Sequence, residues 1–518
     1  MDLNDTMTDP ERQAGINTIS SSSSNSSLQD LKEKNVVIAN TLNLSSPPST
    51  TPSDDSKPSV IKDLTLPEQR GINDTSRQLR RTTCPSPSWE SMLTRVIDVF
   101  FSVYRKMFAV IFVVNLTIFI VLVAKSKGYP TLSNVKDATS ANILASVMMR
   151  QENVVNFIFE IATRVPVSTP FFIRRRLAKV YHYGGVHSGC GVAAVVWFIL
   201  YTVLTTRNFV QSSAGGLPVA NVVTCYILVM MYLFIIIGAH PSFRRRFHDY
   251  FEVVHRFAGW TSFVILWTQT FILGVESSRS EEKNLGLVLV QNPGFWFLLI
   301  STSFIGLSWG RLRLRDVRAE VLSSHATRLH FTYKDMKPYY GLKVSERPLF
   351  EWHAFATIPE PDGKGFSFVV SNAGDWTNKI ISSPPTKLYT RGYPVHGPLY
   401  GARLFRGVVL VATGSGIGPC MSLLVDNKIP RRILWSTRNP ETTYGPGIID
   451  TVLKADPKAV IWNTTEKGYP DIVMETYKLY VESGAEAVYI ISNPKVTRKV
   501  VFGMESRGIA AYGPIFDS

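Results

Sequence analysis

Long uncharged apolar runs, separated by short basic segments, dominate the middle of the chain. A helix needs about 20 apolar residues to cross the hydrocarbon core of a bilayer. Five runs without Asp, Glu, Lys or Arg approach or exceed this length: 107–124, 184–206, 220–239, 257–275 and 285–310. A sixth run, 138–165, contains Arg150, Glu152 and Glu160, which a membrane tolerates where they face a bundle interior or a partner. The pattern predicts a multi-pass α-helical membrane domain of about six helices.

Beyond residue 310 the pattern changes to short alternating strands, at 328–333 and 366–371, which predict a small antiparallel β-barrel. An apolar strand at 407–412 then leads through a glycine-rich turn into a helix at 420–426, as in an α/β nucleotide-binding domain. The first residues are rich in Ser and Pro and predict a disordered tail. A phosphorylation platform is the functional alternative for that tail. The expected domains are the tail (1–96), the membrane domain (97–310), the barrel (311–405) and the α/β domain (406–518).

The distribution of charge adds an orientation to the predicted membrane domain, because the basic residues gather in a few clusters. Among 518 residues, Lys plus Arg total 55 and Asp plus Glu total 40, a net charge of +15, while 45% of residues are hydrophobic. Basic clusters at 174–179, 244–246 and 311–318 lie beside apolar runs, and six helices place all three on one side, the cytoplasmic side. We therefore expect an integral membrane protein with both termini cytosolic and no nucleic-acid partner. The four cysteines are scattered and exclude a disulfide scaffold and a thiolate zinc site.

Candidate chemistry begins at the glycine-rich turn, Gly414-Ser415-Gly416-Ile417-Gly418-Pro419. Glycines let the backbone approach a diphosphate, and the following helix presents its N–H groups to the anion. The order GSGIGP resembles the pyridine-nucleotide loop of the ferredoxin-NADP reductase superfamily. The predicted nucleotide-binding residues here are Gly414, Gly416, Gly418 and Pro419.

Three upstream segments resemble flavin motifs of ferric reductases and NADPH oxidases, in the same order. EWHAFATIP resembles their HPFT, Gly374-Asp375-Trp376-Thr377 resembles their GDWT, and GPLYG resembles their GP(F/Y)G. A strand would place His353, Phe355 and Thr357 on one face, and Thr377 is expected as an N-cap facing the diphosphate. The resemblance implies FAD held in the barrel and NAD(P)H in the α/β domain. It assigns FAD to these residues: His353, Phe355, Thr357, Gly374, Asp375, Trp376, Thr377, Gly397, Pro398 and Gly401.

The chain departs from the family pattern at two positions. Ala356 stands where the family has a hydroxyl directed at the flavin, and Ser492 stands where it has the cysteine of a CGP turn beside the nicotinamide. Ser436 and Arg438 follow a strand and suit a 2′-phosphate of NADPH, or a solvated loop. The family also places an aromatic near its C-terminus against the flavin, a role that Phe516 or Tyr512 would fill.

Histidines in the apolar half extend the resemblance. The family holds two stacked haems through paired histidines on its third and fifth helices, and His187 and His255 match the inner pair. The outer partners are missing, because Tyr201 and Thr268 stand near the expected positions. The resemblance therefore implies one inner haem on His187 and His255 and no outer haem; interfacial histidines are the alternative.

The full set of motifs is most similar to that of fungal TmpA-type transmembrane proteins. That resemblance implies a membrane flavoprotein oxidoreductase that passes electrons from NAD(P)H through FAD to an inner haem or to an acceptor at the cytoplasmic face. The alternative is a transmembrane regulatory protein, in development or secondary metabolism, with a vestigial ferric-reductase fold. Ala356 and Ser492 favour the alternative, whereas GSGIGP and GDWT favour the enzyme. The residues do not specify the electron acceptor.

Overall fold

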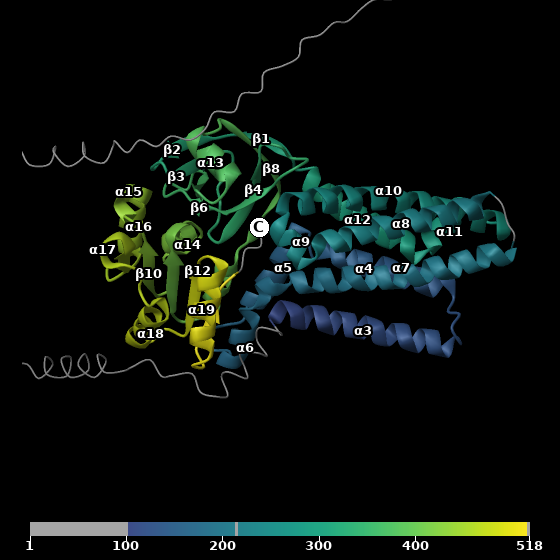
Figure 1. Ribbon diagram of the computed structural model, residues 1–518, viewed down its shortest axis with the longest axis horizontal. Coiled ribbons are helices and arrows are strands. Elements are labelled where there is room, and N and C mark those ends of the chain that lie inside the picture. The colour runs from purple at the N-terminus through teal and green to yellow at the C-terminus, as the bar shows by residue number, and fades with distance from the viewer. Residues whose placement is uncertain (1–101, 213–215, 515–518) are drawn as a thin grey trace, which may run out of the picture. The chain divides into compact units, whose positions relative to one another are not determined.

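The computed structural model describes residues 102–212 and 216–514, a helical part followed by a barrel and an α/β domain (Figure 1). The predicted tail, residues 1–96, and Phe516 lie outside the described residues.

Four helices of the described residues are long and apolar enough to cross a membrane, by length and composition. They are α3 (Val103–Lys125), α7 (Gly184–Ser212), α8 (Leu217–Ala239) and α10 (His248–Ser280). The predicted run 285–310 forms two helices, α11 (Leu285–Gln291) and α12 (Pro293–Trp309), bent by 78°, which raise the number to five if they count as one span. Pro293 lacks the N–H that would continue α11, and the Asn292 side chain caps α12 instead.

The weakest predicted span, 138–165, is wrong as a single helix. The chain forms α4 (Leu132–Met148) and α5 (Glu152–Thr163) with a break between them. Helix α4 packs beside α7 in the bundle, whereas α5 contacts the barrel: the Asn156 side-chain amide donates to the Pro394 carbonyl and accepts from the His396 N–H. The polar residues of this run therefore belong to a junction between the two parts of the chain.

Two of the three basic clusters lie in short helices beside the bundle: α6 (Phe171–Leu177) holds the first three arginines and α9 (Pro241–Arg246) the second three. Lys179 directly precedes the short helix η1 (Val180–His182), and the third cluster, 311–318, follows α12. Arg174 of α6 is buried and pairs with Glu486 of the α/β domain at 2.7 Å. Arg174 thus links the helical part of the chain to the α/β domain, a contact separate from the membrane orientation that the basic clusters predict.

The barrel consists of two four-stranded antiparallel sheets with the orders β1-β8-β4-β5 and β2-β3-β7-β6. Its elements are β1 (Arg313–Asp316), β2 (Arg318–Val321), β3 (Ala326–Phe331), β4 (Tyr340–Ser345), β5 (His353–Ala356), β6 (Ile358–Pro359), β7 (Phe366–Ser371), α13 (Asp375–Ser382) and β8 (Lys387–His396). Phe331, Phe366 and Phe368 stack in its core. Alternating apolar positions fill the space between the sheets, as the sequence predicted for 366–371.

A short helix, η2 (Pro398–Leu404), leads into the α/β domain, whose parallel sheet has the order β11-β10-β9-β12-β13. Its elements are β9 (Val408–Thr413), η3 (Gly414–Gly416), α14 (Ile417–Asp426), β10 (Arg431–Thr437), α15 (Pro440–Tyr444), α16 (Pro446–Ala455), β11 (Val460–Asn463), α17 (Thr464–Lys467), α18 (Ile472–Ser483), β12 (Ala487–Ile491), α19 (Pro494–Glu505) and β13 (Ala510–Tyr512). Strands β9 and β12 are almost wholly apolar and buried, as expected for a parallel sheet covered on both faces.

Candidate functional site

The glycine-rich turn lies at the point where the strand order of the α/β sheet reverses. From β9 the chain runs outward to β10 and β11 and then returns to β12 on the other side of β9. A cofactor binds such sheets at the carboxyl ends of the strands beside this reversal. The turn after β9 and the Ser492-Asn493 turn after β12 both lie at that edge.

Close backbone approach explains the glycines in this turn. A Cβ on Gly416 would overlap the carbonyl oxygen of Ile491, at the end of the neighbouring strand β12. Gly414 has φ of +50°, and its carbonyl accepts from the Trp435 indole. The turn is therefore held against the sheet, and Pro419 lies in the first turn of α14, where its missing N–H costs nothing.

Two helices begin at this edge of the sheet. Helix α14 starts just after the glycine turn, and α19 starts after Asn493, whose side chain accepts from the N–H groups of Lys495 and Val496. The Ser492 hydroxyl, at the position of the family cysteine, hydrogen-bonds with the Thr413 hydroxyl. This edge of the sheet thus offers backbone donors and two hydroxyls, a set that suits a diphosphate and a polar ring.

Ser436 and Arg438 lie at the same edge, at the end of β10. Ser436 pairs with Thr413 across the sheet and is buried. Arg438 is exposed and donates to the Tyr469 hydroxyl at 3.3 Å. The structure therefore places this serine and arginine next to the glycine turn, and their binding of a 2′-phosphate stays a prediction.

In the barrel, the structure brings the first two flavin motifs together. The His353 ring of β5 stacks on the Trp376 indole of α13, with centroids 3.9 Å apart and planes 17° apart. Phe355, on the same face of β5, stacks on Phe368 of the barrel core with centroids 4.7 Å apart. His353 and Trp376 are 23 residues apart in sequence, so only the fold could create this aromatic face.

This aromatic pair carries two buried nitrogens that nothing in the described chain satisfies. Both His353 Nε2 and Trp376 Nε1 are buried and have no hydrogen-bond partner among the described residues. The Glu351 carboxylate is 3.7 Å from His353 Nε2, and burial outweighs its effect and lowers the pKa of His353. Unsatisfied buried polar atoms are rare and indicate a missing partner, so these residues fit a cofactor with hydrogen-bonding groups.

Two threonines of the flavin motifs have other roles in the fold. Thr377 is not the N-cap of α13: Gly374 holds that position, and Thr377 reaches back from the first turn to accept from the N–H groups of Ala373 and Gly374. The hydroxyl that accepts from these two N–H groups therefore belongs to a residue of the helix itself and not to its N-cap residue. Thr357 is fully buried, and its hydroxyl donates to the Tyr340 carbonyl at 2.9 Å. Asp375, the first residue of α13, is exposed beside the cap.

The third motif follows β8 and packs on the α/β domain. Gly397 donates to the Tyr339 carbonyl, Pro398 opens η2, and a Cβ on Gly401 would lie 3.0 Å from the Tyr489 hydroxyl. Next to it, His396 is stacked between Tyr340 and Tyr400, with centroids 4.4 and 3.8 Å away. Burial lowers the pKa of His396 and outweighs the opposing effect of the Glu160 carboxylate, which is 3.6 Å from Nε2.

Sequence reasoning missed this histidine and one arginine. Both His396 nitrogens are buried without a hydrogen-bond partner in the part of the chain that the structure describes. Arg391, also on β8, has its guanidinium 4.4 Å from the Trp309 ring and 4.5 Å from the Trp352 ring, which joins α12 to the barrel. The only signal in the sequence was the position of His396 directly before GPLYG.

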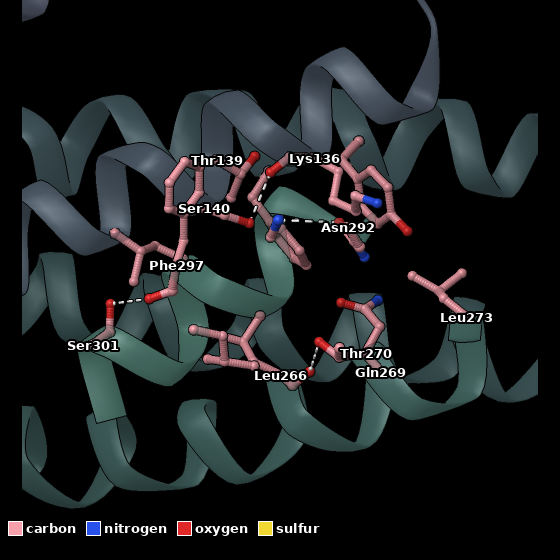
Figure 2. Close-up of a pocket in the computed structure, with 15 residues that line it drawn as sticks. Lys136, Thr139, Ser140, Leu266, Gln269, Thr270, Leu273, Asn292, Phe297 and Ser301 are labelled. Atoms are coloured by element: carbon pink, nitrogen blue, oxygen red, sulfur yellow. Dashed lines mark hydrogen bonds between the residues drawn. The ribbon is translucent and has the colours of Figure 1, made fainter. Parts of the chain in front are cut away.

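The two candidate haem histidines face each other across the bundle. The rings of His187 on α7 and His255 on α10 have centroids 6.3 Å apart. Nδ1 of His187 is 2.9 Å from the Ser146 carbonyl, which leaves Nε2 for another partner. Tyr201, where an outer histidine would stand, instead lines a cavity of about 50 Å³ with Lys136 and Gln269 (Figure 2).

The remaining C-terminal aromatic has a structural role. Tyr512 is fully buried, stacks on Tyr489 and donates from its hydroxyl to the Arg175 carbonyl of α6. It is therefore not exposed to a cofactor in this structure, and the assignment of Phe516 lies outside the described residues.

Comparisons with known proteins point to fungal reductases. Residues 398–518 match the family described as adenylate-forming reductase 03009, C-terminal domain. The chain is 45% identical over 418 residues to adenylate-forming reductase 03009 of Coprinopsis cinerea, and 44% identical over 421 residues to adenylate-forming reductase 06235 of the same fungus. Each match covers 81% of this chain and 40% of the relative, so the chain spans less than half the length of these homologues. The TmpA-type resemblance stays a prediction.

Similarity to solved structures is low. The ferredoxin-NADP+ reductase of Plasmodium falciparum gives a TM-score of 0.32 at 12% identity, over 40% of this chain and 96% of that protein. The flavin- and nucleotide-binding domain of nitric oxide dioxygenase from Vibrio cholerae gives 0.29 at 13%, over 39% and 98%. The reductase-like architecture of the C-terminal part therefore rests on its own barrel and its own sheet order.

Proposed function

We propose that this chain is a membrane-anchored oxidoreductase that takes electrons from NAD(P)H onto FAD. The observation that carries the proposal is the pairing of two features in one unit. A glycine turn lies at the reversal point of the α/β sheet, and an aromatic face with unsatisfied buried nitrogens lies on the preceding barrel. Reductase homologues support the same class of activity.

The α/β domain would hold the nicotinamide nucleotide. The backbone of the glycine turn and the start of α14 would bind the diphosphate, while the Thr413 and Ser492 hydroxyls would face the nicotinamide end. Arg438 would pair with the 2′-phosphate and favour NADPH, because a guanidinium forms two parallel bonds with a phosphate.

The barrel would hold FAD. Its flavin supplies hydride acceptance and the release of single electrons. His353 and Trp376 would present their free nitrogens to it, and the start of α13 would bind its diphosphate. Because Thr357 is tied to Tyr340 and position 356 is alanine, no hydroxyl of this strand is free for the flavin ring.

The helical part would anchor the reductase with the barrel on the cytosolic side. Its apolar helices and the basic residues at their ends support this placement. The relatives are named for adenylate formation as well as reduction; we assign the reduction to the region that they share with this chain. The electrons would leave at the junction of barrel and helices, where Arg391, Trp309 and Trp352 stack.

A haem between α7 and α10 is the finer proposal for the first electron acceptor. His187 and His255 face each other, and the Ser146 carbonyl orients His187, as backbone carbonyls commonly orient axial or metal-bound imidazoles. The test is the reduced-minus-oxidised absorption spectrum of the purified protein. Haem bands that disappear in His187→Ala support a haem, whereas their absence from the wild type rejects it.

NAD(P)H oxidation with an artificial acceptor, measured together with released FAD, tests the main proposal. Ser415 is exposed in the glycine turn, so Ser415→Glu should keep the fold and repel the diphosphate. The matched control is Ser483→Glu, exposed beyond the opposite ends of the strands. We expect stoichiometric FAD in the wild type and in both variants. The rate of NAD(P)H oxidation should be at least about 100-fold lower in Ser415→Glu and unchanged in Ser483→Glu. Equal rates in the wild type and Ser415→Glu would refute the proposal.

A regulatory protein is the second candidate. The hydroxyl pair Thr413–Ser492 favours it, because this pair stands where the resembling family has a thiol beside the nicotinamide. Nucleotide binding without turnover, in protein that contains FAD, would establish this candidate in place of the enzyme.

A further inference from the structure

A cationic hollow lies on the barrel, and its lining contains none of the residues assigned to the flavin. Its volume is about 500 Å³, and it opens between β1, β8 and the segment that follows β3. Its lining includes four cations and no carboxylate; the cations are Arg311, Arg313, Arg315 and Lys334.

The strand geometry gathers these charges on one face. Arg313 and Arg315 are two residues apart on β1, so their side chains leave the strand on the same side. Arg313 pairs with Thr390 of β8, which lines the hollow too. Arg311 follows the end of α12 by two residues, so the hollow adjoins the last apolar helix.

Aromatic rings hold two of the guanidinium groups in place. Arg311 lies 3.9 Å from the centroid of the Tyr393 ring, and Arg315 lies 4.1 Å from that of Tyr333. Arg315 Nε is buried and has no hydrogen-bond partner among the described residues. A guanidinium stacked on a ring keeps its N–H edge for an anion, and an unsatisfied buried donor indicates a missing acceptor.

Nearby carboxylates do not neutralise the hollow. Asp316 is the next residue after Arg315, and its Oδ1 is 3.5 Å from the Lys387 ammonium. Asp335 follows Lys334 and accepts from the Gly365 N–H at 2.9 Å. One further carboxylate, that of Glu152, lies against Gly392 of the lining and accepts from the Ser308 hydroxyl. Four cations beside this one carboxylate leave an excess of positive charge, which an anion of more than one charge would stabilise.

The hollow is distinct from the candidate flavin site. Strands β3 and β7 are antiparallel, with Ala326 opposite Ser371 at one end and Phe331 opposite Phe366 at the other. Helix α13 follows Ser371, whereas Lys334 follows Phe331. The hollow and α13 therefore lie at opposite ends of β3 and β7, although Leu342 of the lining pairs with Phe355 of β5.

We propose that this hollow binds a phosphate-bearing anion, either the headgroup of a phosphorylated lipid or a soluble polyphosphate. Basic clusters directly after a membrane helix bind phosphorylated headgroups, and arginine forks match phosphate geometry. The site goes beyond the proposed redox function and does not depend on flavin or nucleotide binding.

Binding of three probes to the full chain in detergent tests this site. The probes are a short-chain phosphatidylinositol bisphosphate, inositol trisphosphate and inorganic phosphate, each titrated by thermophoresis. The variant Arg311→Gln/Arg315→Gln removes the two stacked guanidiniums, and Arg318→Gln, exposed on β2 outside the hollow, is the matched control. Released FAD reports the fold of each variant.

We expect saturable binding of at least one polyphosphate probe, weakened about tenfold or more in the double variant and unchanged in Arg318→Gln. Binding of the lipid alone identifies a headgroup site, and equal binding of inositol trisphosphate identifies a soluble ligand; both support the proposal. No saturable binding to the wild type, or equal binding to the double variant and Arg318→Gln, overturns it. If the double variant loses FAD, Lys334→Gln, in the exposed segment after β3, takes its place with the same criteria.

Discussion

The ion pair between Arg174 and Glu486 should be the main electrostatic link between the helical part and the α/β domain. Arg174 donates to Glu486 through two nitrogens, at 2.7 and 3.2 Å. It also donates to the Leu404 carbonyl at 2.7 Å and to the Thr169 carbonyl at 2.8 Å. Its side chain is 4% exposed and that of Glu486 is 21% exposed. Replacement of Arg174 by Met would therefore leave two carbonyls without this donor, and the buried side of the Glu486 carboxylate would keep only Arg406, whose N–H donates to it at 2.9 Å and whose guanidinium is 3.8 Å away.

Loss of one partner from a buried pair costs about 3–5 kcal/mol. For a domain of roughly 200 residues, 1 kcal/mol shifts the melting temperature by about 2–4 °C. Arg174→Met should thus lower the melting temperature of the reductase part by about 6–20 °C. The matched control is Lys179→Met, which breaks the Lys179–Glu505 pair at 2.7 Å with side chains 26% and 18% exposed. That more exposed pair should contribute less than about 1 kcal/mol.

Thermal unfolding of the detergent-purified variants, followed by tryptophan fluorescence, measures both shifts. Arg174 also holds the pKa of Glu486 below its usual range, chiefly through its hydrogen bonds. Because the folded pKa is lowered, this stabilisation is complete above the unfolded value, about 4.3. It is lost as the pH falls through the folded pKa. The difference between wild type and Arg174→Met should therefore shrink below about pH 4. A shift in Arg174→Met no larger than in Lys179→Met would refute this reasoning.

Three further predictions concern the site. Gly416→Ala should abolish folding or nucleotide binding, because the new Cβ would overlap the Ile491 carbonyl. Gly418→Ala should be tolerated, because the nearest atom to its new Cβ would be 3.6 Å away. The yield of folded protein and the affinity for NADPH should be measured for both variants. Trp376→Phe keeps a ring against His353 but removes Nε1, so FAD affinity should fall about tenfold; unchanged affinity would mean that the indole nitrogen does not contact the cofactor. Arg438→Gln should raise the KM for NADPH by about tenfold and leave that for NADH unchanged; equal changes for both nucleotides would exclude a 2′-phosphate contact.

Local sequence patterns determined the elements and the glycine turn. Four of the predicted apolar runs are long helices, strand 366–371 has the predicted bounds, and GSGIGP follows β9 and opens α14. These features depend on apolar periodicity and on glycine and proline stereochemistry, which act over a few residues. Periodicity could not show the break between α4 and α5, because polar residues suit both a bundle interior and a domain junction.

Tertiary structure decided which of these residues meet. The stack of His353 on Trp376, the burial of His396 between two tyrosines, and the gathering of four cations around one hollow all arise from contacts between different elements of the fold. The same pairing tied the Thr357 hydroxyl to Tyr340, and α13 began at Asp375, which made Thr377 a residue of its first turn. Residue types along a chain specify which contacts are chemically favourable. Only the folded arrangement of sheets and helices fixes which of those contacts form, because each side chain must satisfy its polar atoms and its packing together with neighbours from other segments.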